Sequence, residues 1–176
     1  MHRVIGAAII IFATSYYGFY TSIRLNRKIK CMDDLCTSLQ MLNSYIVYSR
    51  LTVGEAFNKL SCISSNKNVS DLYNRIHIKL NKSDMDNEKL FDEIWKCEVD
   101  LLADNLELGQ VYKELLYELG TFTAYMDPDM QSKHILGVKK KIETENETLK
   151  REQLPKNKIY RTAGMTVGLI IVIALL

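Results

Sequence analysis

Apolar residues recur along much of the chain with the period of an α-helix. Between residues 25 and 46 they stand three or four positions apart, at Leu25, Ile29, Met32, Leu35, Leu39, Leu42 and Ile46. This spacing puts them on one face of a helix. Because the uncharged run of residues 4–23 comes directly before, we expect one long helix that begins in that run and continues to about Ile46.

The segment between residues 52 and 99 predicts three shorter helices. Thr52 and Glu55 have the spacing of a capping box, from which a helix runs to about Cys62. Ser70 can cap the next helix, whose apolar face carries Leu72, Ile76 and Leu80. The third begins at Asn87, and its apolar positions are Leu90, Phe91, Ile94, Trp95 and Val99.

Two more helices are predicted before residue 155. One spans about residues 106–119, and Gly120 can end it. Asp127-Pro128 is an N-cap followed by proline at the first helical position, so a heavily charged helix begins there and runs to about Gln153, before Pro155 breaks it. Alternating β-branched runs and Asn-Gly hairpin signals do not occur. The predicted fold class is all-α, an antiparallel bundle of about six helices.

Both ends of the chain are apolar. The first run, residues 4–23, has the roughly 20 residues that a membrane helix needs. The second, residues 162–176, is shorter, but extending it back by one turn brings an aromatic ring and a cation to the membrane interface. We therefore expect transmembrane helices at residues 1–23 and 159–176, with this bundle held between them. A cleaved signal peptide is the alternative at the first end, and a buried core helix is the alternative at the second.

The basic residues predict on which side of the membrane the middle of the chain lies. They cluster at the inner ends of the two apolar runs, at Arg24, Arg27, Lys28, Lys30, Lys150, Arg151, Lys156, Lys158 and Arg161. By the positive-inside rule, residues 24–158 form a cytoplasmic domain. The net formal charge of +2 is too small to argue for a nucleic-acid partner. We expect the basic clusters to contact the anionic head groups of the lipid bilayer.

Residues typical of an active site or a metal site are scattered. The three histidines stand far apart, and the four cysteines form no CxxC pair; they are His2, His77, His134, Cys31, Cys36, Cys62 and Cys97. The sequence has no glycine-rich phosphate loop, no HExxH and no nucleophile elbow. We therefore expect a protein that is not an enzyme, with no catalytic residue, no cofactor, no metal and free thiols.

A series of short motifs spans nearly the whole chain. In order, they are Gly18-Phe19, Ile46-Val47-Tyr48, Trp95, Asp127, Lys133-His134-Ile135, Lys158, and the pair Gly164 and Gly168 in the last apolar run. In the order, spacing and total length of these motifs, the chain resembles the stage III sporulation protein AB family of endospore-forming bacteria. It departs from the family pattern at Asn43 and Tyr45, where acidic residues are usual, at residues 51–53, where Thr-Pro-Leu is usual, and at Ala124, where glycine is usual.

The resemblance implies a role that the motifs alone do not give. The family belongs to a sporulation channel complex of the outer forespore membrane, and its cytoplasmic domain is similar to the platform domain of type II secretion and type IV pilus systems. It implies a membrane-anchored adaptor that docks a secretion-type ATPase, similar to stage III sporulation protein AA, on the mother-cell side, beside other membrane components of the channel. The alternatives are a self-associating scaffold of envelope or division assembly and a small membrane-tethered enzyme.

The charged helix offers candidate docking residues for such an ATPase. Lys139, Lys140 and Lys141 are consecutive and lie among acidic residues. Complementary charge mainly sets the encounter rate and the register of two partners. The alternative is a solvated helix face, as charged runs usually are.

Overall fold

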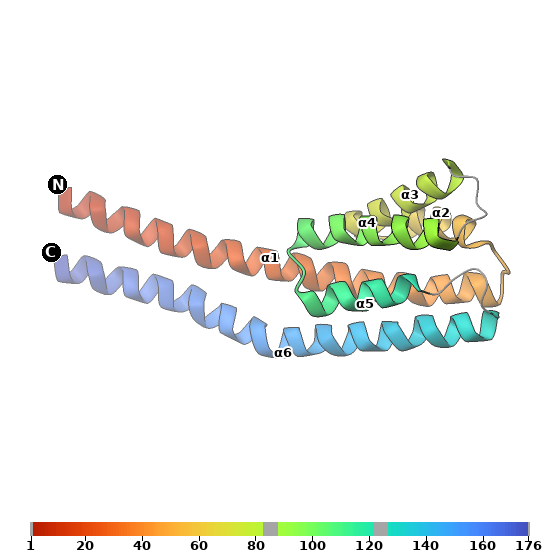
Figure 1. Cartoon of the computed structure of the whole chain (residues 1–176). Coiled ribbons are helices and arrows are strands. Elements are labelled where there is room, and N and C mark those ends of the chain that lie inside the picture. The colour runs from red at the N-terminus through yellow and green to blue at the C-terminus, as the bar shows by residue number, and fades with distance from the viewer. Residues whose placement is uncertain (1, 83–87, 122–126, 176) are drawn as a thin grey trace. The chain divides into compact units, whose positions relative to one another are not determined.

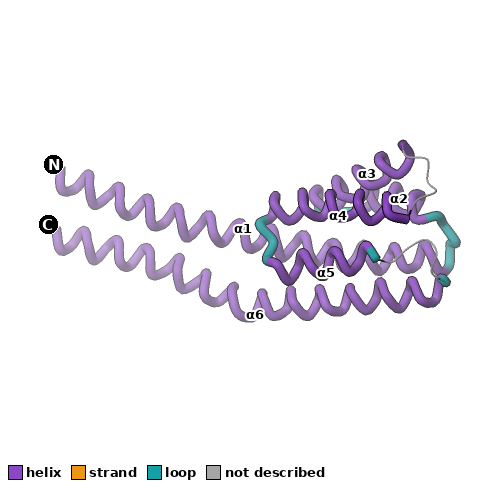
Figure 2. The backbone as a smooth tube through the Cα atoms, viewed as in Figure 1, coloured by secondary structure: helices purple, strands orange, loops and turns teal. Residues whose placement is uncertain are grey.

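The protein is all-α in the part of the chain that the structure describes. The computed structural model describes residues 2–82, 88–121 and 127–175, with side chains for residues 16, 19–82, 91–121 and 127–153. These residues form six helices and no strand (Figures 1 and 2), namely α1 (His2–Val47), α2 (Val53–Ile63), α3 (Lys67–Lys82), α4 (Glu88–Leu106), α5 (Gln110–Gly120) and α6 (Pro128–Leu175). The expected helical bundle and the unbroken first helix are confirmed.

The chain divides into two compact units. One is a bundle of residues 28–146, which contains α2 to α5 with the second part of α1 and the first part of α6. The other consists of residues 1–27 and 147–176. Within the bundle, α2 packs on α3, α3 on α4, and α4 on α5. The expected domain limits at residues 23 and 159 stay a prediction.

The start of α2 is the one expected, and the start of α3 is not. At α2, the Glu55 backbone N–H donates to Thr52 Oγ1 at 3.3 Å, and the Thr52 N–H donates to Glu55 Oε2 at 3.0 Å. α3 begins at Lys67, because the side chain of Asn66 accepts the Asn68 N–H at 3.0 Å. The predicted cap, Ser70, therefore lies inside α3. The predicted start of α4, Asn87, lies outside the described residues.

The boundary between α4 and α5 corrects the prediction of a helix from residue 106. Leu106 ends α4, and α5 begins only at Gln110. Glu107 has a φ of 49°, and Leu108 N–H donates to the Ala103 carbonyl at 2.9 Å. This is the Schellman arrangement that ends helices, built here with a non-glycine residue in the left-handed conformation. The turn is also held from α1, since Lys28 Nζ donates to the Glu107 carbonyl at 2.7 Å.

Gly120 ends α5 as expected, but its packing gives the reason for glycine. The following residue, Thr121, is right-handed, with a φ of −76°. A Cβ added to Gly120 would overlap the indole ring of Trp95. That ring is fully buried, and its Nε1 donates to the Leu116 carbonyl at 2.7 Å. Glycine is therefore needed because the tryptophan lies against the backbone of α5.

The expected break of the last helix at Pro155 does not occur. α6 begins at Pro128, with Asp127 accepting the Asp129 N–H at 3.3 Å, as predicted for a cap. It then continues past Pro155 to Leu175. Proline lacks an N–H and crowds the preceding turn, but the residues on either side can keep their own helical hydrogen bonds.

Among the residues with described side chains, no helix is both long and apolar enough to cross a membrane. The side chains of residues 1–15 and 154–176 lie outside the described residues. These two segments contain most of the expected spans.

Aromatic rings fill the core between α2, α3 and α4. The Phe57 ring stacks on Tyr73 at a centroid distance of 5.4 Å and on Trp95 at 6.0 Å, and Phe91 stacks on Trp95 at 6.2 Å. The aliphatic positions predicted for α3 and α4 are also buried, namely Leu72, Ile76, Leu80, Ile94 and Val99. The side chain of Leu90 lies outside the described residues.

Candidate docking surface

α6 packs on the bundle through one narrow stripe of its surface. Its buried residues stand three or four positions apart, at Gln131, Ile135, Val138, Ile142 and Asn146. Such spacing defines a single helix face. The opposite face of α6, over residues 130–144, is therefore directed away from the bundle.

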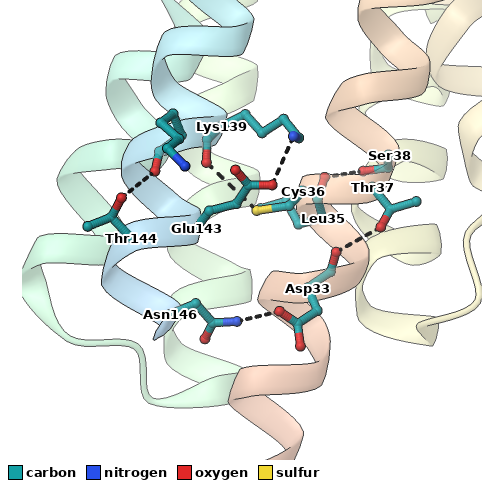
Figure 3. A network of polar contacts seen from close by, with 10 residues as sticks. Asp33, Leu35, Cys36, Thr37, Ser38, Lys139, Glu143, Thr144 and Asn146 are labelled. Carbon is teal, nitrogen blue, oxygen red and sulfur yellow. Dashed lines mark hydrogen bonds and ion pairs between the residues drawn. The ribbon is translucent and has the colours of Figure 1, made fainter. Parts of the chain in front are cut away.

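Asn146 fixes the rotation of α6 against its neighbours. Its Nδ2 donates to the Ile29 carbonyl at 3.2 Å and to the Asp33 carboxylate at 2.8 Å, and its Oδ1 accepts from the Tyr112 hydroxyl at 3.3 Å. The residue is only 1% exposed, and Figure 3 shows its amide directed at Asp33. Because a buried amide must keep its partners, this contact joins α1, α5 and α6 in one register.

A second contact holds α6 against α1 at Lys139, about two helix turns before Asn146. The Cys36 thiol of α1 lies 3.9 Å from the Lys139 carbonyl oxygen (Figure 3), which is the range of a weak S–H hydrogen bond. Cys36 and its neighbour Cys31 are buried. Burial, with a smaller contribution from Asp34, raises the pKa of Cys31 to about 12. The Cys31 thiol therefore stays protonated, and we interpret both residues as packing groups.

The structure separates the three candidate docking lysines. Lys139 is partly buried and pairs with Glu143 of the same helix at 2.8 Å (Figure 3). Lys141 pairs with Glu118 of α5 at 2.6 Å. Lys140 is exposed, and its side chain has no ion pair within the described residues. Of the three lysines, Lys140 therefore offers the charge that is most available to a partner.

A stripe of exposed residues runs along the outward face of α6. It consists of Met130, Lys133, Gly137, Lys140 and Thr144, which we call the outer stripe. Lys133 resembles Lys140 in being exposed and without an ion pair among the described residues. The outer stripe carries two positive charges and no acidic residue, so its charge suits a negatively charged partner.

The bundle also contains a small surface pocket between α3 and α4. It has a volume of about 250 Å³ and is lined by Asn68, Asp71, Arg75, Leu101, Leu102 and Asn105. Cofactor and drug-sized ligand sites usually have about 300–1,000 Å³. Within the described residues, no three His, Cys, Asp or Glu side chains are grouped so that they could hold a metal ion.

Comparison with known proteins identifies the family. The family model described as stage III sporulation protein AB matches residues 3–176. The chain belongs to this family. It is also 23% identical over 176 residues to the stage III sporulation protein AB of Bacillus subtilis (strain 168), covering 100% of both chains. No solved structure matches the chain.

The residues that carried the family resemblance lie in different environments. Ile46, Trp95 and Ile135 are buried, whereas Phe19, Tyr48 and Lys133 are exposed. Asp127 caps α6, and His134 Nε2 lies 2.9 Å from the Glu118 carbonyl oxygen. The burial of four other positions is not described, namely Gly18, Lys158, Gly164 and Gly168.

Two residues that position α6 and α4 are missing from the sequence-based prediction, namely Asn146 and Glu98. Asn146 stands among charged residues, so the local pattern predicts a solvated face. Glu98 is fully buried and pairs with Arg75 at 2.5 Å and Lys79 at 2.6 Å. For Glu98 a signal is present, because the residue stands directly before Val99 on the apolar face of α4.

Proposed function

We propose that this protein is a non-enzymatic, membrane-anchored adaptor of a sporulation channel. In this proposal, the bundle docks a secretion-type ATPase similar to stage III sporulation protein AA, on the mother-cell side of the outer forespore membrane. Membership of the family supports the sporulation role. The observation that carries the docking role is the outer stripe of α6, where Lys133 and Lys140 are exposed on a helix that Asn146 holds in place.

The two apolar runs support anchoring at both ends. Residues 4–23 and 162–176 carry no charge, and basic residues follow the first run and precede the second. The positive-inside rule then favours a cytoplasmic bundle with both termini on the far side. In this arrangement the outer stripe faces the compartment in which an ATPase finds its nucleotide.

Cysteine labelling tests the anchoring. Cys62 and Cys97 are exposed on the bundle. Because the proposal places the bundle in the cytoplasm, a membrane-impermeant thiol reagent should leave both cysteines unlabelled in intact cells. It should label them after the membrane is opened. A cysteine added after Leu176 should be labelled in intact cells. Protection of that added cysteine, or labelling of the two native ones before opening, would contradict the orientation.

Charge reversal on the outer stripe tests the docking. The full chain in detergent or nanodiscs should bind the purified ATPase, and binding should weaken as salt rises because exposed charges are screened. Lys133→Glu with Lys140→Glu should weaken binding by about tenfold or more and reduce its salt dependence. Stability should hardly change, since substitutions of exposed charges usually stay within about 0.5 kcal/mol.

A second double reversal is the matched control. Lys67 and Lys82 are exposed at the two ends of α3, so Lys67→Glu with Lys82→Glu makes the same change in net charge on another part of the bundle. This control should bind the ATPase nearly as the wild type does. Equal losses in both variants would indicate attraction by net charge alone. Self-association without ATPase binding would instead favour the alternative role of a scaffold.

A further inference from the structure

The outer stripe has an open place in its middle, at Gly137. The residue lies away from both ends of α6 and is exposed to solvent, and a Cβ added there would meet nothing within 4 Å. Glycine weakens an exposed helix relative to alanine because it loses more conformational freedom on folding. Gly120 of α5 shows the contrast, since the ring of Trp95 fills the place of its Cβ. Packing within the bundle therefore explains the glycine at Gly120 and does not explain the one at Gly137.

The charges beside Gly137 indicate what could approach it. Lys133 stands four residues before it and Lys140 three residues after it, so both lie about one turn away on the same face. Both are exposed, and neither has an ion pair within the described residues. A partner segment that lies over Gly137 therefore meets a positive charge on each side, which acidic side chains complement.

The spacing along the outer stripe indicates the shape of the partner. Met130, Lys133, Gly137, Lys140 and Thr144 stand alternately three and four residues apart. This is the repeat through which one helix contacts another along its length. Met130 is 60% exposed at one end of the stripe and can supply an adaptable apolar contact.

We propose that an acidic helix of the docked ATPase lies along the outer stripe and crosses α6 closest at Gly137. This inference rests on the proposed function and specifies how the ATPase is held. Helix axes lie about 8–10 Å apart, depending on the side chains between them. The missing side chain at Gly137 lets the two backbones approach, and acidic residues of the partner reach Lys133 and Lys140 from either side.

Substitutions at Gly137 test the proposal because stability and binding should change in opposite directions. In the full chain, Gly137→Ala should raise the melting temperature, because a Cβ there meets no atom of the bundle. The same variant should bind the ATPase more weakly than the wild type. Gly137→Leu should weaken binding further, by about tenfold or more, while the bundle stays folded.

Gly54 offers a matched control on another helix. It lies in α2, where an added Cβ also meets nothing within 4 Å. Gly54→Ala should raise the melting temperature and leave ATPase binding unchanged. Calorimetry of the variants and titration against the purified ATPase, at low and high salt, give both quantities.

The outcomes separate this inference from the function on which it rests. If the wild-type chain binds the ATPase and Gly137→Leu binds it equally well, the helix contact is overturned and the adaptor role stands. The same holds if Gly137→Ala and Gly54→Ala weaken binding equally. If the wild-type chain does not bind the ATPase, both proposals are overturned.

Discussion

The two sides of the bundle are held together by different kinds of contact. Between α2, α3 and α4, the aromatic rings around Phe57 and Trp95 stack at centroid distances of 5.4 to 6.4 Å. Between α1, α5 and α6, the central contact is the buried amide of Asn146 on α6, whose partners come from α1 and α5. Packed aromatic rings hold α2, α3 and α4 together, and directional hydrogen bonds position α6 against α1 and α5.

This difference indicates what each side contributes. Closely packed rings stabilise through the apolar area that they bury, and they tolerate no additional atom. A buried amide contributes less net stability, but it permits only one register, as a single buried asparagine does in coiled coils. The helix that carries the outer stripe is held by the second kind of contact. Its exposed face is therefore set by a register and not only by packing.

The largest loss of stability is expected at Gly120, where the Trp95 ring leaves no room for an extra atom. This ring belongs to the side between α2, α3 and α4, which we call the aromatic side. In Gly120→Ala the new methyl group must displace the Trp95 ring, which also donates to the Leu116 carbonyl. Overpacking a core costs typically 1–3 kcal/mol and occasionally more, so we expect a loss of about 3 kcal/mol in the free energy of unfolding. Urea denaturation with tryptophan fluorescence measures it, because Trp95 is the tryptophan of this chain.

Gly54→Ala is the control for the Gly120 substitution. Its added Cβ meets nothing within 4 Å, so it should stabilise α2 by up to about 1 kcal/mol. If Gly120→Ala proved as harmless as Gly54→Ala, the described contact between Trp95 and α5 would be wrong.

A substitution at Asn146, on the side between α1, α5 and α6 that we call the polar side, should lower the free energy of unfolding by less. Asn146→Leu removes the acceptor of the buried Tyr112 hydroxyl and the donor to Asp33. Asp33 is exposed and can turn to water, whereas the Tyr112 hydroxyl is left without its partner. An unsatisfied buried group costs about 1–3 kcal/mol, so we expect a loss of about 2 kcal/mol.

A double-mutant cycle shows whether that loss comes from the hydrogen bond. Tyr112→Phe removes the hydroxyl and leaves the ring. Adding it to Asn146→Leu should cost much less than adding it to the wild type, because the hydroxyl no longer needs a partner. Strict additivity would mean that Tyr112 and Asn146 do not interact.

The comparison also shows which parts of the fold the sequence could predict. Helix periods and the capping box at Thr52 are local patterns, and the structure confirms them. The predicted start of α5 at about residue 106 is wrong because apolar spacing continues through Leu106 and Leu108, and the turn uses Glu107 where glycine is usual. Local pattern cannot reveal that a turn is held by Lys28, which lies 79 residues away in the sequence.

The candidate surface was predictable only in part. That the helix after Asp127 is charged follows from composition, but which lysines are available depends on partners in other helices. Lys141 is paired with Glu118 of α5, and the carbonyl of Lys139 faces Cys36 of α1. Three consecutive lysines point about 100° apart on a helix. A run of charge therefore predicts a helix with a charged surface and not a single charged face.

A smaller effect is expected at a carboxylate buried beside the aromatic side. Burial alone would raise the pKa of Glu98, but hydrogen bonds and charges from Arg75 and Lys79 outweigh it and lower this pKa. A lowered folded-state pKa stabilises the protein above the unfolded value of about 4.3, and that contribution is lost as pH falls through the folded value. The two cations are about 40% exposed, so Glu98→Gln should cost only about 1.5 kcal/mol at pH 7.

Urea unfolding at several pH values tests the role of Glu98. The difference between wild type and Glu98→Gln should shrink as pH falls below about 4.3. Asp92→Asn is the control, because Asp92 pairs with Lys96 on the surface at 2.6 Å, with both side chains more than a third exposed, and such pairs contribute about 0–1 kcal/mol. A gap between wild type and Glu98→Gln that stays constant with pH would assign the loss to packing.

The smallest effect is expected at Tyr73, where the two sides of the bundle meet. Its ring stacks on Phe57, and its hydroxyl lies 2.7 Å from Ser38 Oγ of α1. Ser38 donates to the Leu35 carbonyl at 2.7 Å, so the Tyr73 hydroxyl is the donor in their contact. Burial raises the pKa of Tyr73, which keeps that proton in place. Tyr73→Phe keeps the stacking and leaves Ser38 with its carbonyl partner, so we expect a loss of at most about 1 kcal/mol.

Tyr112→Phe in an otherwise wild-type chain is the comparison, because it leaves Asn146 Oδ1 without its donor and should cost more. If Tyr73→Phe were the more damaging of the two in urea denaturation, the contact between Ser38 and Tyr73 would belong with the register-setting contacts of the polar side.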